Sequence, residues 1–170
     1  PKLKKIKNKI MTLKVVFMGT PQFAVPALKK ICESEMDIVT VYSQPPRKSN
    51  RGMNIEKSPV HKFADDNNLN IRTPSKLDDD WEYFKSLKFD LAIVVAYGQI
   101  ISKNFLEIPE HGFLNIHASI LPKWRGAAPI QRSIMEQDTF TGISIMQIEE
   151  QLDAGPVLIR QEIELNENST

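Results

Sequence analysis

Asn115 and His117 are the residues of this chain whose types and spacing most clearly suggest chemistry. They alternate with apolar residues over 114–118, as the side chains of a half-buried β-strand do. Such alternation places the carboxamide and the imidazole on one face, about 7 Å apart along the strand. Pro122 follows and ends any pairing of that strand. This is the layout of a polar reaction site, although an Asn and a His that only satisfy buried backbone groups have the same spacing.

A resemblance to a known family separates these two interpretations. Residues 115–122 resemble the Asn-x-His-x-Ser-Leu-Leu-Pro signature of the folate-dependent formyltransferases, and 124–132 are similar to the branch whose acceptor is initiator methionyl-tRNA. Residues 151–156 resemble the Leu-Asp-x-Gly motif of the family, with Gln151 where a glycine usually precedes the motif. The resemblance extends from about Met11 to the end of the chain. It implies transfer of a formyl group from 10-formyltetrahydrofolate to the methionine α-amine of that tRNA, without a metal.

The resemblance also assigns roles to individual residues. Asn115 and His117 would donate hydrogen bonds to the oxyanion of a tetrahedral intermediate, and Asp153 would orient His117 and assist proton movement. Folate would lie against two stretches, Tyr97, Gly98, Gln99 and Ile100, and Ser119, Ile120, Leu121 and Pro122. The tRNA would be bound by Arg47, Arg51, Gly52, Lys123, Trp124 and Arg125.

Other functions are compatible with the same three polar residues. Related enzymes formylate a purine precursor or an amino sugar, and related hydrolases pass the formyl group to water. Residues 124–132 and the loop at 43–57 favour the tRNA enzyme. A folate- or tRNA-binding module without activity belongs to a different class, and the presence of Asn115, His117 and Asp153 together argues against it.

The elements that must position these residues indicate an α/β fold, with a doubly wound, mainly parallel, Rossmann-like sheet of about seven strands in three layers. Strands are predicted over 13–18, 38–42, 71–74, 89–96, 114–118, 142–147 and 157–165, and helices over 23–32, 58–67, 78–87 and 128–136. The apolar run at 89–96 is typical of a central parallel strand that is covered on both faces. Gly19 follows the first strand without partner glycines, so neither a dinucleotide nor an ATP fingerprint is present.

The stretch from 43 to 57 is predicted to be a long irregular loop. It holds four basic residues, Arg47, Lys48, Arg51 and Lys57, against the single acid Glu56. A loop of this length and charge can contact phosphates or can be a solvated connection. The tRNA branch of the family has an insertion here with an Arg-Gly pair, matched by Arg51 and Gly52. His61, in the helix that follows, is expected at the surface.

Composition bounds the remaining possibilities. The chain has 170 residues, 41% of them hydrophobic, which suits one globular domain. The single cysteine, Cys32, excludes an internal disulfide. Five lysines and no acid lie in residues 1–10; beyond them, 17 basic and 21 acidic residues leave the body slightly acidic. We therefore expect a basic extension at 1–10. The resemblance implies that residues 11–170 are a catalytic domain, cut off before a C-terminal tRNA-binding domain. The resemblance implies a cytoplasmic bacterial protein, with an organellar homologue left open, that is a monomer at full length. The longest apolar run, 91–97, is far shorter than the roughly 20 residues of a membrane-spanning helix, so we expect no membrane contact.

Overall fold

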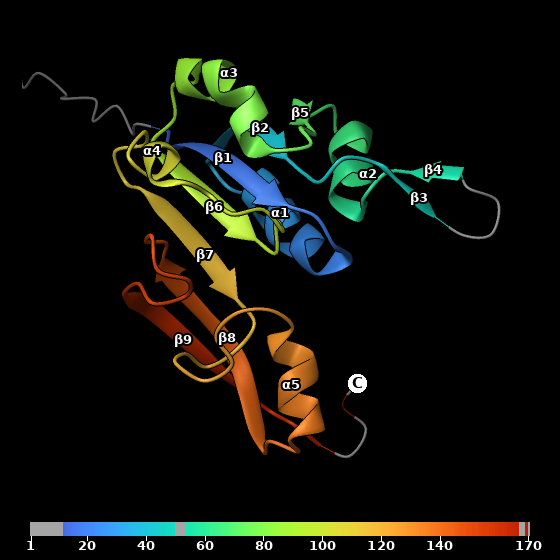
Figure 1. The fold of residues 1–170 in the computed structure, drawn as a ribbon, viewed down its shortest axis with the longest axis vertical. Coiled ribbons are helices and arrows are strands. Elements are labelled where there is room, and N and C mark those ends of the chain that lie inside the picture. The colour runs from blue at the N-terminus through green and yellow to red at the C-terminus, as the bar shows by residue number, and fades with distance from the viewer. Residues whose placement is uncertain (1–11, 50–53, 167–168, 170) are drawn as a thin grey trace, which may run out of the picture.

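The computed structural model describes residues 12–49, 54–166 and 169. Arg51 and Gly52, two of the residues predicted to contact tRNA, lie outside these ranges. The fold is built on a seven-stranded sheet (Figure 1). Its strands, in spatial order, are β5 (Ile71–Arg72), β2 (Asp37–Tyr42), β1 (Lys14–Gly19), β6 (Leu91–Val95), β7 (Phe113–His117), β8 (Phe140–Gln147) and β9 (Val157–Glu164).

The first five strands of this order are parallel, whereas β8 and β9 are each antiparallel to their neighbour. Strand order runs outward from β1 to β2 in one direction and from β6 to β7 in the other. The direction in which successive strands are added to the sheet therefore reverses between β1 and β6. In folds of this kind, ligands bind beyond the carboxyl ends of the strands at such a point.

Helices cover both faces of the parallel part of the sheet, which confirms the predicted doubly wound architecture. One apolar core joins alternate residues of β1, such as Val15 and Phe17, to Leu28 and Ala64 of the helices on that side. The other joins Val16 and Met18 to Phe84 and Phe105. The helices are α1 (Val25–Cys32), α2 (Pro59–Asp66), α3 (Trp81–Ser86), α4 (Lys103–Leu106) and α5 (Pro129–Met135). Both faces of the central strands are thus buried, as the continuous apolar run at β6 predicts.

The 43–57 stretch differs from its prediction as an irregular loop. It contains two short strands, β3 (Arg47–Ser49) and β4 (Asn54–Glu56), which pair antiparallel and extend away from the main sheet (Figure 1). Their residues are mostly polar, so the apolar signal that reveals a strand in sequence is missing. Cross-strand backbone pairing outside the core makes them a hairpin.

The helix predicted to begin at Ser58 is present, and its cap is visible. The Ser58 side chain accepts a hydrogen bond from the backbone N–H of His61 at 3.0 Å. The prediction of an exposed His61 is wrong, since the residue is only 9% exposed. Burial is the largest influence on its imidazole and lowers the pKa of His61.

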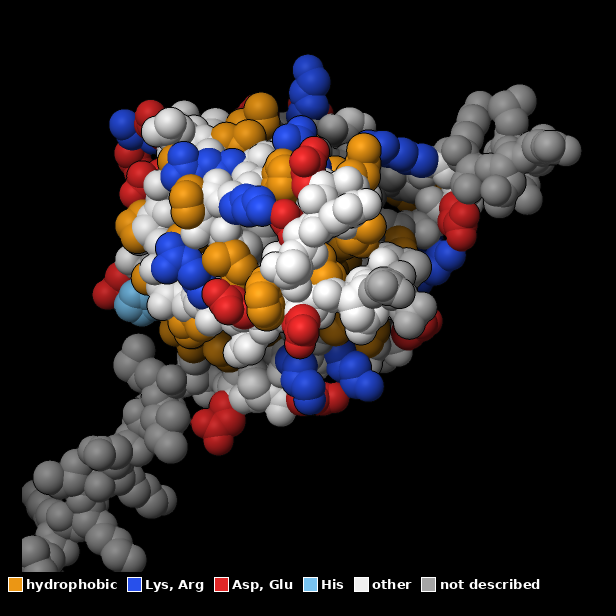
Figure 2. Space-filling view, turned by 90° about the horizontal axis from the view of Figure 1, so that it is seen from below, with side chains coloured by type: hydrophobic (Ala, Val, Ile, Leu, Met, Phe, Trp, Pro, Cys, Tyr) orange, Lys and Arg blue, Asp and Glu red, His pale blue; other side chains and the backbone are white. Residues whose placement is uncertain are grey.

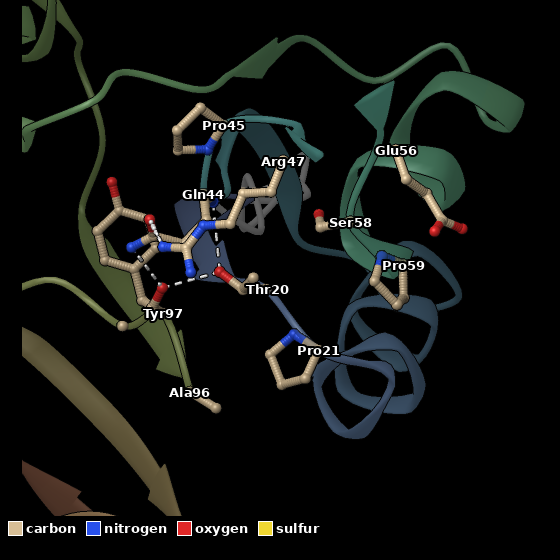
Figure 3. Close-up of a pocket in the computed structure, with 11 residues that line it drawn as sticks. Thr20, Pro21, Gln44, Pro45, Arg47, Glu56, Ser58, Pro59, Ala96 and Tyr97 are labelled. Carbon is tan, nitrogen blue, oxygen red and sulfur yellow. Dashed lines mark hydrogen bonds between the residues drawn. The ribbon is translucent and has the colours of Figure 1, made fainter. Parts of the chain in front are cut away.

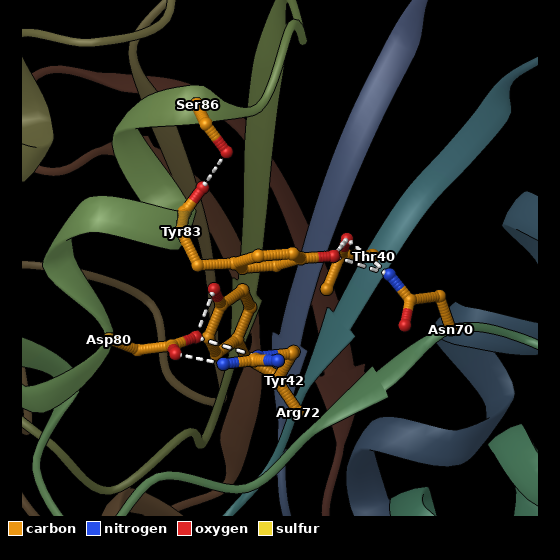
Figure 4. Close-up of polar contacts among 7 residues, drawn as sticks. All are labelled: Thr40, Tyr42, Asn70, Arg72, Asp80, Tyr83 and Ser86. Atoms are coloured by element: carbon orange, nitrogen blue, oxygen red, sulfur yellow. Dashed lines mark hydrogen bonds and ion pairs between the residues drawn. The ribbon is translucent and has the colours of Figure 1, made fainter.

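A polar network at the β5 edge links the sheet to the segment that leads into α3 (Figure 4). The buried Asp80 carboxylate accepts hydrogen bonds from the Tyr42 hydroxyl at 2.8 Å and from Arg72 Nε at 2.9 Å. A second Arg72 nitrogen contacts the other Asp80 oxygen, and the guanidinium lies 4.1 Å from the centre of the Tyr83 ring. Strands β2 and β5 are thereby tied to one carboxylate.

The other end of the sheet has a more exposed apolar surface. Several large hydrophobic side chains of α5, β8 and β9 are exposed, namely Met135, Phe140, Leu158, Ile159 and Ile163. Seen from below, hydrophobic side chains lie on the surface among charges of both signs (Figure 2). No helix among the described residues is long and apolar enough to span a membrane.

Candidate active site

The two loops predicted to contact folate follow neighbouring parallel strands. Tyr97 comes shortly after β6, and Ser119 shortly after β7. Because β6 and β7 are parallel and adjacent, both loops lie at the same edge of the sheet, the one formed by the carboxyl ends of the parallel strands. This edge also holds the side chains of Asn115 and His117, in the last residues of β7.

Asn115, His117 and Asp153 converge at this edge. Asn115 Nδ2 lies 3.4 Å from Asp153 Oδ1, and His117 Nδ1 lies 3.7 Å from Asp153 Oδ2. The side chains of His117 and Asp153 are only 7% and 11% exposed. Both polar residues of β7 therefore point to the same side, as their alternation predicts, and reach one carboxylate from a distant segment.

The other nitrogen of the His117 ring contacts the backbone. His117 Nε2 lies 2.9 Å from the carbonyl oxygen of Trp124. A carbonyl oxygen can only accept, so this nitrogen carries the hydrogen and donates it. When the ring is protonated, its second N–H faces the Asp153 carboxylate. The imidazolium form of His117 thus has a negative or partly negative oxygen beside each nitrogen.

Asp153 also organises the loop after β7. Its Oδ2 accepts a hydrogen bond from the backbone N–H of Gly126 at 2.8 Å. One carboxylate therefore faces the carboxamide, the imidazole and the loop backbone. This third contact has no signal in the sequence, because it involves only the N–H of Gly126.

The turn that carries Asp153 explains why the motif ends in glycine. Asp153 has a φ of +46°, and a Cβ on Gly155 would lie 2.1 Å from the carbonyl oxygen of Gln147 at the end of β8. Gln151, which replaces the usual glycine of the family, is not among the residues with positive φ. The turn thus forms without a glycine at 151, whereas the position of Gly155 requires one.

The predicted folate stretches differ in how far their side chains are already engaged. The Tyr97 ring is buried, and its hydroxyl has no hydrogen-bond partner among the described residues. Burial raises the pKa of Tyr97 well above its usual value. The Gln99 carboxamide accepts from Leu77 N at 2.6 Å and donates to the Pro74 carbonyl oxygen at 3.1 Å, while Ile100 is 92% exposed.

The second stretch forms a tight loop. Ser119 is fully buried, and its hydroxyl donates to the carbonyl oxygen of Lys123 at 2.5 Å. The hydroxyl of Ser144 on β8 donates to the carbonyl oxygen of Ser119 at 2.7 Å and accepts from the N–H of Leu121 at 3.1 Å. Ile120 lies over Gly142, where an added Cβ would be 2.5 Å from Ile120 Cδ1. Pro122 is exposed, and its peptide bond to Leu121 is cis.

A cavity of about 430 Å³ opens beyond the carboxyl ends of β1, β2 and β6 (Figure 3). The Tyr97 carbonyl oxygen joins these ends, because it accepts from Thr20 Oγ1 at 2.8 Å and from Gln44 Nε2 at 3.3 Å. Arg47 donates to Gln44 Oε1 at 3.1 Å and lines the cavity. Of these lining residues, Arg47, Tyr97 and Gly98 were predicted to bind a ligand, whereas Thr20 and Gln44 were not. Their signal would have been a polar residue within two positions of the end of each strand, since Thr20 is the first residue after β1 and Gln44 the second after β2.

The predicted tRNA-binding residues near β7 lie in different environments. Arg125 is exposed. Lys123 Nζ lies 2.5 Å from Asp138 Oδ1, and the Trp124 indole Nε1 donates to Asp138 Oδ2 at 2.7 Å. The sequence does not point to Asp138, which lies between α5 and β8.

Taken together, these groups can hold and polarise a carbonyl carbon at the end of β7. An amide N–H donor, an imidazolium donor and a carboxylate lie within reach of one another, which is the set that acyl transfer through an oxyanion requires. Within the described ranges, no three His, Cys, Asp or Glu side chains gather where they could hold a metal ion.

Comparison with known proteins finds relatives that share one name. A methionyl-tRNA formyltransferase of Pelagibacter ubique is 59% identical over 150 residues, which are 86% of this chain and 48% of that protein. One from Parvibaculum lavamentivorans is 51% identical over 160 residues, 93% of this chain and 52% of that protein. The chain spans about half the length of the curated relatives it matches.

Solved structures share the fold at low identity. A phosphoribosylglycinamide formyltransferase from Bacillus halodurans superposes with a TM-score of 0.75 at 16% identity, covering 92% of this chain and 82% of that one. A formyltetrahydrofolate deformylase from Pseudomonas syringae gives 0.74 at 18% identity, covering 95% and 54%. The family model for formyl transferases matches residues 13–170, which is nearly the whole chain. The chain therefore belongs to the formyl transferase family.

Proposed function

We propose that this chain moves a formyl group from 10-formyltetrahydrofolate to the α-amine of methionine on initiator methionyl-tRNA. The observation that carries the proposal is the convergence of Asn115, His117 and Asp153 at the end of β7. The relatives named as methionyl-tRNA formyltransferases support the choice of acceptor. The same relatives are bacterial translation enzymes by name, and we propose a cytoplasmic protein.

In this mechanism the amine nitrogen attacks the formyl carbon, and a tetrahedral oxyanion forms. Asn115 Nδ2 has two hydrogens; its contact with Asp153 is long, at 3.4 Å, and leaves the second hydrogen for the oxyanion. Nε2–H of His117 is bound to the Trp124 carbonyl oxygen, so a protonated His117 would donate from Nδ1, whose 3.7 Å contact with Asp153 is too long for a hydrogen bond. Donors placed for the transition-state charge lower the barrier, and one such donor is typically worth about 10²–10³ in rate.

The intermediate then collapses and the bond between the formyl carbon and the folate nitrogen breaks. The amine loses a proton and the departing folate nitrogen gains one, so the charges balance. Asp153 keeps the imidazolium oriented and, through Gly126, keeps the loop beside it in place. Folate itself would lie against the 97–100 and 119–122 stretches, which border this edge.

The tRNA acceptor end would reach this site past the cavity lined by Arg47. Arg51 and Gly52, Lys123, Trp124 and Arg125 are proposed as its further contacts. The cavity volume, about 430 Å³, is within the range of small-molecule sites and suits one terminal residue of a nucleic acid or an aminoacyl group.

The decisive experiment incubates the purified protein with 10-formyltetrahydrofolate, with and without charged initiator tRNA. We expect formyl-methionyl-tRNA and free tetrahydrofolate to appear in equal amounts, and only when the charged tRNA is present. Release of folate in water alone would indicate a hydrolase, and binding without turnover would indicate a module without activity. Either result would contradict the proposal.

Replacing Arg47 by Gln tests the acceptor contact. If the guanidinium neutralises one phosphate of the single-stranded acceptor end, the slope of log K against log salt should become less steep by about 0.7. Folate affinity should not change. Lys30→Gln on α1 is the matched control, because it removes a surface cation that pairs with Glu33 and lies outside the cavity. Equal salt slopes for Arg47→Gln and the wild type would remove Arg47 from the tRNA site.

A further inference from the structure

Asp138 is a mostly buried carboxylate that the proposed chemistry does not use. Its side chain is 9% exposed, and its backbone N–H donates to the carbonyl oxygen of Ser133 at the end of α5. One carboxylate oxygen contacts Lys123 Nζ at 2.5 Å, and the other accepts from the Trp124 indole at 2.7 Å. The hydrogen bonds from Lys123 and then Trp124 hold the pKa of Asp138 below its usual range, so this acceptor is ionised at neutral pH.

Trp124 has a backbone conformation that a bulky residue rarely adopts. Its φ is +60°, in the left-handed region, and such strain persists only where surrounding contacts hold it. Three contacts do so. The indole N–H binds Asp138, the Lys123 ammonium lies 5.2 Å from the ring centre, and the Trp124 carbonyl oxygen accepts from His117 Nε2 at 2.9 Å.

These contacts form a continuous connection from Asp138 to the imidazole. The indole anchors the Trp124 side chain, the anchored side chain maintains the left-handed backbone, and that backbone directs the carbonyl oxygen at His117 Nε2. Asp153 contacts the same ring from its Nδ1 side. It also accepts a hydrogen bond from the backbone N–H of Gly126, in the loop that carries Trp124. The ring is therefore held at both nitrogens, by Asp153 directly and by Asp138 through Trp124.

We propose that Asp138 is a positioning residue for His117 that acts through the indole and the backbone carbonyl of Trp124. The expected effect on kcat rests on the proposed function, whereas the expected effect on the hydrogen bond of the His117 ring does not. The proposal also gives Lys123 an intramolecular role, since its ammonium forms an ion pair with Asp138 beside the Trp124 ring.

The direct test observes the His117 ring by nuclear magnetic resonance of the 170-residue chain. The chain has three histidines, so the His117 signal can be assigned by its loss in His117→Gln. In the wild type, the Nε2 proton should exchange slowly with solvent. Asp138→Ala, and Trp124→Phe, which keeps an aromatic ring but lacks the indole N–H, should each speed this exchange about tenfold or more, because the opening of a hydrogen bond limits exchange. Asp138→Asn, which keeps an acceptor, should lie between.

Two controls separate positioning from general destabilisation. Glu33→Gln removes a carboxylate that pairs with a single lysine, at 2.8 Å on the surface of α1, and should leave the His117 signal unchanged. If Asp138→Ala fails to fold, Trp124→Phe and Asp138→Asn decide the question. An unchanged His117 exchange rate in Trp124→Phe would overturn the proposal.

The kinetic arm measures kcat and KM separately. We expect Asp138→Ala and Trp124→Phe each to lower kcat about tenfold with little change in the KM for folate. A misoriented His117 N–H would stabilise the transition state less and hardly alter binding of the ground state. The double variant should be no slower than the slower single variant. A lower melting temperature with an unchanged kcat would show a merely structural role and overturn the proposal. A wild type without formyl transfer would contradict the proposed function instead, and the His117 measurement would still decide the positioning.

Discussion

Replacing His117 by alanine is expected to lower kcat for formyl transfer by a factor of about 10²–10⁴ and to leave folate affinity nearly unchanged. When the ring is protonated, Nε2–H is bound to the Trp124 carbonyl oxygen and Nδ1–H, 3.7 Å from Asp153 Oδ2, is not in a hydrogen bond, so its interaction with the substrate is strongest when negative charge develops there. Interactions of this kind appear in the transition state and hardly contribute to binding the ground state. Single-turnover rates at saturating folate, together with folate affinity from fluorescence titration, measure the two quantities separately.

Asp153 allows a finer separation. Asp153→Ala removes both the charge beside His117 and the acceptor for Gly126 N–H, which lies at 2.8 Å. Asp153→Asn can turn its remaining oxygen to Gly126 and loses mainly the charge. We expect both variants to be slow, with Asp153→Ala slower, and the combination with His117→Ala to be little worse than either alone, since residues that act as a unit are not additive.

Glu33→Gln is the control for these variants. It removes an exposed carboxylate at the C-terminal end of α1 and should retain the wild-type rate. A His117→Ala variant that kept kcat within about threefold of the wild type would exclude His117 from the transition state, because general acid–base or donor roles are worth far more than that.

The sequence predicts the parts of this site that depend on side-chain type and periodicity. Alternation over β7 places Asn115 and His117 on one side, and apolar runs locate the strands of the parallel sheet. Asp153 cannot be found by periodicity, because an acid before Ala-Gly-Pro is an ordinary turn residue. Only the resemblance to a family motif links it to His117, 36 positions away in the sequence.

Other parts of the site leave no mark in the sequence. The acceptor for His117 Nε2 is a backbone carbonyl, which every residue has, and Trp124 has a left-handed φ that a bulky residue rarely adopts, while its indole donates to Asp138. Asp138 itself is one acid among many between α5 and β8. The β3–β4 hairpin escaped prediction for a related reason, since its strands are mostly polar in sequence and so have no apolar period.

The largest expected effect on stability concerns Asp80, which lies far from the candidate catalytic residues in the β5-edge network (Figure 4). Its side chain is 8% exposed and accepts from Arg72 and Tyr42. Asp80→Ala leaves both donors without their acceptor and should reduce the free energy of unfolding by about 3 kcal/mol, the lower end for a broken buried ion pair. The lower end applies because the Arg72 side chain is 38% exposed and can be rehydrated. Tyr42→Phe should cost only about 1 kcal/mol, since it removes one hydrogen bond.

The same network makes stability depend on acid. Burial alone would raise the pKa of Asp80, but the hydrogen bonds from Arg72 and Tyr42 outweigh it and hold the pKa below its usual range. The unfolded chain therefore binds this proton more readily than the folded one. The contribution of Asp80 is fully present above its unfolded pKa of about 3.9 and is lost as the pH falls through the lower folded value.

Urea unfolding at a series of pH values checks both expectations. The difference in unfolding free energy between the wild type and Asp80→Ala should be constant near neutral pH and should shrink as the pH falls below about 4. Asp65→Asn is the matched control, since Asp65 pairs with Lys57 at 2.6 Å but is 38% exposed, and such surface pairs are worth about 0–1 kcal/mol. If Asp80→Ala were no more destabilising than Asp65→Asn, the edge network would be no more than a surface ion pair.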